Sequence, residues 1–188
     1  EFMVDIADEI DRENKIITDL LSLVKLDKTS ADMNITVVSI NELLELILKR
    51  LRPIAATRNI ELVLESFRDV TAEIDEVKLT LALSNLIENA IKYNRNDGWV
   101  KVSLNADHKF FIIKVADSGV GIPEDVQDRV FERFYRVDKA RSRETGGTGL
   151  GLSITKNIVI MHNGQIKLYS NEKEGTTFSV RIPLTYIG

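Results

Sequence analysis

Cysteine is absent from this 188-residue chain, and only two histidines are present, His108 and His162. The lack of cysteine excludes disulfide bonds and thiolate metal sites, and two histidines are too few for a histidine-rich metal cluster. No apolar run approaches the roughly 18 residues of a membrane span, and no signal-peptide pattern opens the chain. Internal repeats and low-complexity tracts are also missing. What remains is the sequence of a globular domain held together by an apolar core.

The composition suits one full domain with a short appendage. Apolar residues make up 44% and charged residues 29% of the chain, which is enough apolar material for a substantial core. The net charge of -4 comes without a concentrated basic face, so we expect no nucleic-acid partner. Because Glu1, Phe2 and Met3 resemble the remnant of a cloning site, we expect a piece of a longer protein. We expect this piece to be cytoplasmic, and a membrane anchor in the parent protein is compatible with it.

Residues 1–28 are predicted to form a helix with a coiled-coil seam. The seam positions recur at alternating steps of three and four residues: Met3, Ile6, Ile10, Glu13, Ile17, Leu20 and Val24. Such a seam needs a partner helix, and none is predicted nearby in the chain. A polar stretch follows, so we place a linker at residues 29–36 and the main domain at residues 37–188.

The main domain is predicted to alternate helices with strands. Ser39 and Glu42 form a capping box for one helix, and Asp75 caps a second helix that runs to about Tyr93. Hydrophobic patterns predict the other elements: strands at 61–65, 71–74, 100–104, 111–115, 165–170 and 176–183, and a third helix at 150–161. Hairpins with helices between them indicate an α+β fold, a two-layer sandwich of one mixed sheet with helices on one face.

Three polar residues form a stripe on the second helix, apart from its apolar face. Asn85, Asn89 and Lys92 follow one another at steps of four and three. Carboxamide oxygens can ligate a hard cation such as Mg²⁺, and a neighbouring ammonium can neutralise phosphate charge. An Asn-x-x-x-Asn pair on its own is more often a solvated polar face, so the stripe alone leaves both interpretations open.

Two glycine-containing segments are typical of ligand-binding loops. Asp117 to Gly121 directly follows an apolar strand, so that glycines let the backbone approach a flat ligand and the carboxylate can accept from an amine such as that of adenine. Gly146 to Leu152 opens a helix, where free N–H groups attract phosphate, although it is neither a P-loop nor a Rossmann fingerprint. An ordinary turn after a strand would also explain the first segment, and a flexible loop with a helix start would explain the second. The basic stretch between them fits a lid or a solvated loop equally well.

In this order, the segments resemble the ATP-binding domain of sensor histidine kinases, which belong to the gyrase–chaperone–kinase superfamily. Five segments are similar to the family's N box, G1 box, F box, G2 box and last-strand signature, respectively: Asn85 to Tyr93, Asp117 to Gly121, Phe131 to Tyr135, Gly147 to Gly151, and Gly175 to Phe178. The match runs from about Val37 to Pro183. It implies a Bergerat-type ATP-binding fold with ATP and Mg²⁺ as ligands.

The resemblance assigns residues to the phosphate end of the nucleotide. Asn89 would ligate Mg²⁺, while Asn85 and Lys92 would contact the phosphates. Arg136 on the lid would reach the γ-phosphate. The residues implied to hold the phosphate chain are those of the glycine-rich segment: Gly147, Gly149, Leu150 and Gly151.

The resemblance also assigns residues to the purine end. Asp117 would accept from the adenine amine, and Gly119 and Gly121 would make room for the base. Tyr93 would pack near the adenine or the ribose, and Thr177 would lie beside the adenine.

The implied reaction is transfer of the γ-phosphoryl group from ATP to a histidine, for relay to a response regulator by a parent protein that we expect to be a homodimer. The seam helix is similar to the second helix of the family's dimerisation and phosphoacceptor hairpin, whereas the acceptor histidine belongs to the first. His108 falls in a hairpin connection, and His162 ends a helix, where a protonated imidazole would suit the dipole. We therefore predict a chain that binds Mg-ATP but cannot phosphorylate itself.

Other functions stay open at this point. ATP hydrolases of the superfamily place a glutamate base four residues before the magnesium asparagine, but Asn85 occupies that position here. Glu88 lies one residue before Asn89, about a quarter turn away on the helix. A serine kinase that acts on a separate protein is a second enzyme alternative, and a nucleotide-binding interaction module without turnover is the non-enzyme alternative.

Overall fold

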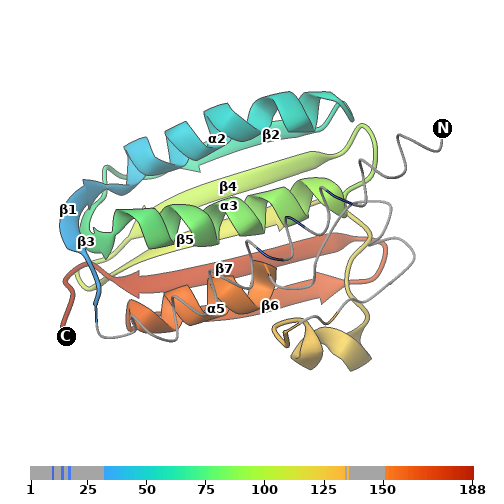
Figure 1. Ribbon diagram of the computed structural model, residues 1–188. Helices are drawn as coiled ribbons and strands as arrows, with labels where there is room; N and C mark the ends of the chain where they lie inside the picture. Colours follow the sequence, from blue (N-terminus) through green and yellow to red (C-terminus); the bar gives the residue numbers. More distant parts are fainter. Residues whose placement is uncertain (1–9, 11–13, 15–16, 18–31, 134, 136–150) are drawn as a thin grey trace.

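The computed structural model describes residues 32–133, 135 and 151–188, together with Ile10, Asn14 and Ile17. Within these residues, helices and strands alternate along the chain (Figure 1). Their bounds are β1 Ile35–Ser39, α2 Ile40–Ala56, β2 Glu61–Ser66, β3 Thr71–Asp75, α3 Glu76–Lys92, β4 Trp99–Ala106, β5 Phe110–Asp117, the 3₁₀ helix η1 Glu124–Arg129, α5 Gly151–Met161, β6 Gln165–Asn171 and β7 Gly175–Pro183.

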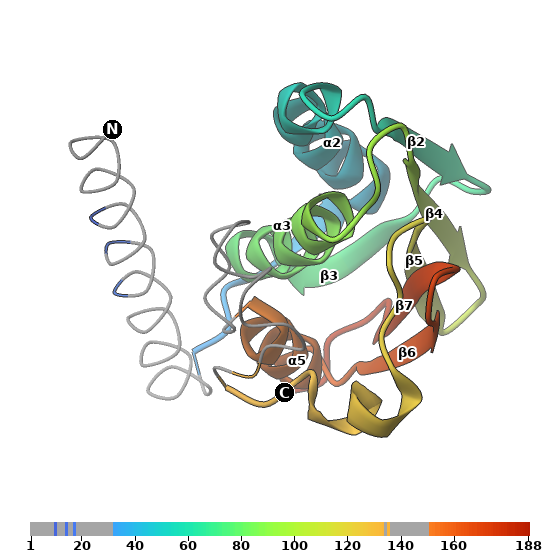
Figure 2. The same cartoon turned by 90° about the vertical axis from the view of Figure 1, so that its right-hand side faces the viewer.

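The main sheet has five strands in the order β2-β4-β5-β7-β6. Only the β2–β4 pair is parallel, and the other three pairs are antiparallel. Figure 2 shows α2, α3 and α5 together on one side of this sheet. The predicted mixed sheet with helices on one face is therefore confirmed, as are the hairpins β4–β5 and β6–β7.

One strand was assigned to the wrong sheet. β3 does not join the main sheet but pairs with β1 in a separate antiparallel ribbon, from Ile35 opposite Asp75 to Ser39 opposite Thr71. β1 itself begins inside the stretch predicted as a linker. Its five residues show no alternation of buried and exposed positions, because a two-stranded ribbon has no continuous buried face.

The predicted helix caps are confirmed. The Ser39 hydroxyl accepts from the Glu42 N–H at 3.3 Å, and Oδ1 of Asp75 accepts from the Lys78 N–H at 3.1 Å. Each bond satisfies one of the donors that a helix start leaves unpaired. At the end of α5, the chain turns away at Asn163, whose φ is 60°.

The core lies between the helices and the inner face of the sheet. Leu79, Leu83 and Leu86 of α3 are fully buried, as are Val102 of β4 and Ile113 of β5. Spacings of three and four on the helix and of two on the strands bring these faces together. The sheet and α3 thus form a rigid frame for the residues at the end of each element.

Most of the predicted seam helix lies outside the described residues. Ile10 and Ile17 are helical and 52% and 55% exposed, respectively. No helix in the described part of the chain has the length and apolar character needed to cross a membrane.

Candidate nucleotide-binding site

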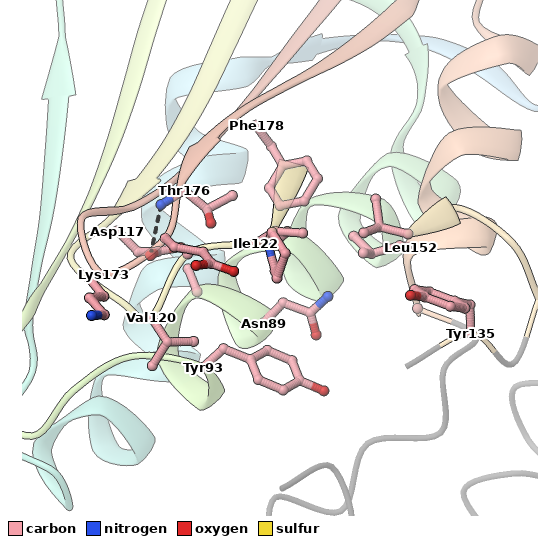
Figure 3. A pocket seen from close by; sticks show the side chains of 16 residues that line it. Asn89, Tyr93, Asp117, Val120, Ile122, Tyr135, Leu152, Lys173, Thr176 and Phe178 are labelled. Atoms are coloured by element: carbon pink, nitrogen blue, oxygen red, sulfur yellow. Dashed lines mark hydrogen bonds between the residues drawn. The ribbon is translucent and has the colours of Figure 1, made fainter. Parts of the chain in front are cut away.

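A cavity of about 380 Å³ opens where the last turns of α3 meet the loop after β5, the β6–β7 turn and the start of α5 (Figure 3). This volume lies within the range of small-molecule sites. The residues that line the cavity are Asn89, Ala90, Tyr93, Asp117, Val120, Gly121, Ile122, Pro123, Val130, Tyr135, Gly151, Leu152, Glu172, Lys173, Thr176 and Phe178.

Asp117 is the carboxylate of this cavity. It ends β5 directly opposite Thr176 of β7, and its Oδ1 accepts from the N–H groups of Gly119 at 2.8 Å and Thr176 at 3.2 Å. Burial raises the pKa of Asp117 to about 6, and the two hydrogen bonds only partly oppose this effect. Both donors reach Oδ1, so among the described residues Oδ2 keeps its acceptor capacity for a ligand.

The glycines after Asp117 serve close packing of the protein itself. Gly121 has a φ of 74°, and a Cβ there would lie 2.1 Å from the carbonyl oxygen of Asn171. A Cβ on Gly119 would lie 2.4 Å from the carbonyl oxygen of Tyr93. Gly121 lines the cavity, whereas Gly119 does not. Their missing side chains make room for the β6–β7 turn and the end of α3. The room for a base that the resemblance implies stays a prediction.

Only one residue of the predicted polar stripe on α3 lines the cavity. Asn89 and Tyr93 line the cavity, and Figure 3 shows both side chains on the same wall. Asn85 lies outside the lining, and its Nδ2 donates to the carbonyl oxygen of Gly151 at 3.4 Å, which joins α3 to the start of α5. Lys92 also lies outside the lining.

The glycine-rich segment and the lid are largely outside the described residues. This applies to Arg136, Gly147, Gly149 and Leu150. Gly151, the first residue of α5, is described and lines the cavity beside Leu152. Tyr135, at the edge of the predicted lid, lines the cavity as well.

The threonine that lines the cavity is the neighbour of the predicted one. Thr177 does not line the cavity, whereas its neighbour Thr176 does. Successive side chains of a strand point to opposite faces, so Thr176 shares the inner face with Phe178, and Thr177 faces away from it. The Thr176 hydroxyl lies 2.8 Å from that of Ser170.

Several wall residues were not predicted. Ile122, Val130 and Phe178 form apolar walls, and Glu172 and Lys173 enter from the β6–β7 turn. The strand pattern around Phe178 predicted a buried side chain, but no local signal indicates that its ring would border a cavity.

The structure also corrects the expected state of His162. The side chain is 2% exposed, its Nε2 accepts from the Asp75 N–H at 3.0 Å, and its Nδ1 lies 2.8 Å from the carbonyl oxygen of Ile158. Burial lowers the pKa of His162. The neutral imidazole therefore bridges α5 and β3, and the protonated form expected from the helix dipole is wrong.

Residues 74–186 match a protein family described as histidine kinase-, DNA gyrase B- and HSP90-like ATPases. The chain belongs to this family. The match covers α3, the cavity walls and every strand of the main sheet except β2. It confirms the ATP-binding family that the sequence motifs resemble.

Relatives within this ATPase family include sensor kinases. The chain is 38% identical over 185 residues to the sensor histidine kinase WalK of Bacillus subtilis, and 39% identical over 186 residues to the sensor protein kinase WalK of Staphylococcus saprophyticus. Each alignment covers 97% of this chain and 30% of the relative. The chain thus spans about a third of these curated relatives.

Solved structures of histidine kinases share the fold. The catalytic domain of the histidine kinase ThkA superposes with a TM-score of 0.73 at 29% identity, over 81% of this chain and 97% of that domain. Full-length ShkA in complex with AMPPNP gives a TM-score of 0.82 at 25% identity, over 98% of this chain and 38% of ShkA. ThkA in complex with the response regulator TrrA gives a TM-score of 0.79 at 25% identity, over 98% of this chain and 51% of the matched chain.

Proposed function

We propose that this chain is the catalytic domain of a sensor histidine kinase, which binds Mg-ATP and transfers its γ-phosphoryl group to a histidine elsewhere in a dimeric parent protein, for relay to a response regulator. The observation that carries the proposal is the meeting of Asn89, Tyr93 and Asp117 around one cavity in a member of this ATPase family. The relatives are named sensor kinases, one of them a sensor histidine kinase, which supports a histidine as the residue that accepts the phosphoryl group. A cytoplasmic location is part of the same proposal.

The purine would occupy the Asp117 end of the cavity. Oδ2 of Asp117 would accept from the exocyclic amine of adenine, and Thr176 would take the place beside the base that the motif resemblance gave to Thr177. Ile122 and Phe178 offer apolar surface for a flat ring. A polar group that fixes orientation within apolar walls is the usual construction of a ligand site.

The phosphates would lie toward α5. The carboxamide oxygen of Asn89 is a hard ligand of the type that Mg²⁺ accepts, and Gly151 brings the N-terminus of α5 to the cavity, where backbone N–H groups favour anions. Arg136, Gly147, Gly149 and Leu150 belong to this end by their motifs alone. Asn85 and Lys92 would act from outside the lining. The chain would contribute positioning and charge neutralisation, which dominate phosphoryl transfer.

Hydrolysis of ATP as the main activity has weaker support. Asn85 stands where the superfamily hydrolases place their glutamate, and Glu88 lies outside the cavity lining. Glu172 lines the cavity from the β6–β7 turn, next to Gly121 at the Asp117 end. Among the described residues, the cavity therefore offers no carboxylate at the phosphate end to activate water.

Titration with a fluorescent ATP analogue in the presence of Mg²⁺ tests the binding part of the proposal. Asn89→Ala and Asp117→Ala should each weaken binding at least tenfold, which corresponds to about 1.4 kcal/mol. Asp69→Ala, at an exposed position, should bind like the wild type. Wild-type affinity in both cavity variants would refute the site.

The transfer part needs a separate acceptor. Incubation with γ-labelled ATP and a polypeptide that carries the dimerisation hairpin of a WalK relative should place acid-labile phosphate on the hairpin. The chain itself should stay unlabelled, because His162 is buried with both ring nitrogens engaged and the exposed His108 lies in the β4–β5 turn, outside the cavity lining. Rapid release of inorganic phosphate without label on the hairpin would favour hydrolysis instead.

A further inference from the structure

Arg58 lies in the turn between α2 and β2, yet its guanidinium group holds the C-terminal end of α3. Nη1 donates to the carbonyl oxygens of Ile91 at 2.7 Å and Lys92 at 2.9 Å. Nη2 donates to the carbonyl oxygen of Asn94, and Nε donates to the side chain of Asn96 at 3.0 Å. Carbonyls at a helix end lack intrahelical donors, and here one side chain supplies donors to two of them and to the carbonyl of Asn94 just beyond the helix.

The same end of α3 is bonded to the loop that follows β5. The carbonyl oxygen of Tyr93 accepts from the Val120 N–H at 3.2 Å. The side chain of Asn94 is fully buried, and its Oδ1 accepts from the Ser118 hydroxyl at 2.9 Å while its Nδ2 donates to the carbonyl oxygen of Trp99 at 2.9 Å. The last turn of α3 and the Asp117 loop are therefore connected through backbone and buried side-chain bonds.

These bonds connect Arg58 to the two walls of the cavity without placing it in the lining. Tyr93 lies between two of the residues whose carbonyls Arg58 holds, and Val120, which is bonded to Tyr93, lines the cavity from the Asp117 loop. We propose that Arg58 is a positioning residue that holds the C-terminal turn of α3 in register with the Asp117 loop, so that the cavity is preformed for the nucleotide. This inference rests on the proposed function of the cavity.

The chemistry of the side chain makes the inference specific to arginine. A guanidinium group presents five donors in a rigid planar fork, whereas the lysine ammonium is a single point on a flexible stem. Lysine at this position keeps the positive charge near the helix end but cannot span the three carbonyls. Methionine keeps the stem and removes every donor.

Affinity for a fluorescent ATP analogue is the first test. Arg58→Met should weaken binding about tenfold, which equals about 1.4 kcal/mol, and Arg58→Lys should lie between Arg58→Met and the wild type. Arg50→Met, at an exposed position of α2, is the matched control and should bind within twofold of the wild type. If Arg58→Met fails to fold, Arg58→Lys decides, and wild-type affinity in Arg58→Lys would then overturn the inference.

A second readout separates positioning from a general loss of stability. The amide signals of Tyr93 and Val120 should shift in the NMR spectrum of Arg58→Ala while those of residues 106–110, at the β4–β5 turn, stay in place. Guanidinium ion at non-denaturing concentration should restore part of the affinity of Arg58→Ala, and sodium ion at the same ionic strength should not. Loss of affinity without rescue, or with shifts throughout the domain, would contradict the inference.

The outcomes also separate this inference from the function on which it rests. A wild-type chain that binds no nucleotide would overturn the proposed function and the inference with it. A wild-type chain that binds, together with Arg58 variants of equal affinity, would overturn the inference alone.

Discussion

Asp75 and Asp117 both end strands beside α3, yet their pKa values are shifted in opposite directions. Burial pushes the pKa of Asp75 upward, but the Lys78 N–H, the Lys78 ammonium and the Asn34 N–H together hold it below its ordinary value. Burial dominates at Asp117, where two backbone N–H groups leave the pKa at about 6. Asp75 is satisfied within the protein, whereas Asp117 keeps acceptor capacity at the wall of a cavity.

The contrast separates a structural carboxylate from a binding one. A buried charge needs a cation or enough donors to offset the loss of water. Asp75 has both, since the Lys78 ammonium lies 3.0 Å from its Oδ2. Asp117 has neither a cation nor a third donor among the described residues, which fits a site where a ligand supplies the missing donor. Raised pKa values of this kind cluster at functional sites.

Removal of the Asp75 side chain should give the largest effect. Asp75→Ala deletes the cap of α3, the ion pair with Lys78 and the bond to the Asn34 N–H, so we expect the free energy of unfolding to fall by about 2–4 kcal/mol. Urea unfolding at pH 7.5 measures this change. Asp69→Ala, an exposed aspartate, should change it by less than about 0.5 kcal/mol. A similarly small loss of unfolding free energy in Asp75→Ala would contradict the structural role of the Asp75 carboxylate.

Asp117→Asn should raise the free energy of unfolding, whereas Asp75→Ala lowers it. The folded chain binds this proton more tightly than the unfolded chain, so stability contributed by Asp117 is present below about pH 4 and lost as the pH rises to about 6. Asparagine avoids that loss and can still accept from the N–H groups of Gly119 and Thr176. We expect the free energy of unfolding of the variant to exceed that of the wild type by about 1–3 kcal/mol at pH 8, as measured by urea unfolding without nucleotide.

The pH dependence of this gain supplies the control. The difference between Asp117→Asn and the wild type should vanish near pH 4, where both side chains are neutral. Affinity for the fluorescent ATP analogue should fall in the variant although the fold is more stable, because a binding site can retain a group that lowers the stability of the fold. A variant that is less stable at both pH values would show that the charge of Asp117 costs nothing in the folded chain.

Local signals explain which parts of the two carboxylate sites could be predicted from the sequence. Asp75 was predicted as a cap because its donor lies three residues away, and Asp117 was predicted from the glycines beside it. The bond between Asp75 and His162 spans 87 residues, and no periodicity indicates such a contact. For the same reason, the partners of Arg58, 33 to 38 positions further along the chain, were missed.

The candidate site was predictable to a similar extent. Asn89 and Gly151 were predicted from a helical stripe and a helix start, which are local features, and Tyr93 was predicted from the family resemblance; all three line the cavity. Thr176 lines the cavity and Thr177 does not, a difference that depends on the pairing of β7 with β5 rather than on local sequence. The order of strands in the sheet is set by such pairings as well, which explains why β3 was assigned to the main sheet.

His162 provides the smallest and sharpest test, because its ring nitrogen accepts a hydrogen bond from the Asp75 N–H. Burial lowers its pKa in the folded chain, so the unfolded chain binds the proton more tightly. Stability contributed by the neutral imidazole is therefore complete above about pH 6.5 and is lost as the pH falls. When the pH falls from 7.5 to 5.5, we expect the free energy of unfolding of the wild type to decrease by about 1 kcal/mol more than that of His162→Gln. Urea unfolding at both pH values measures this difference.

The Asp117 contribution is the same in both chains and cancels from this comparison. His108→Gln, in the exposed β4–β5 turn, is the matched control and should follow the wild type. Equal pH slopes in His162→Gln and the wild type would mean that the imidazole accepts a proton in the folded chain without cost. The bond from the Asp75 N–H to Nε2 would then have to break at no expense in stability.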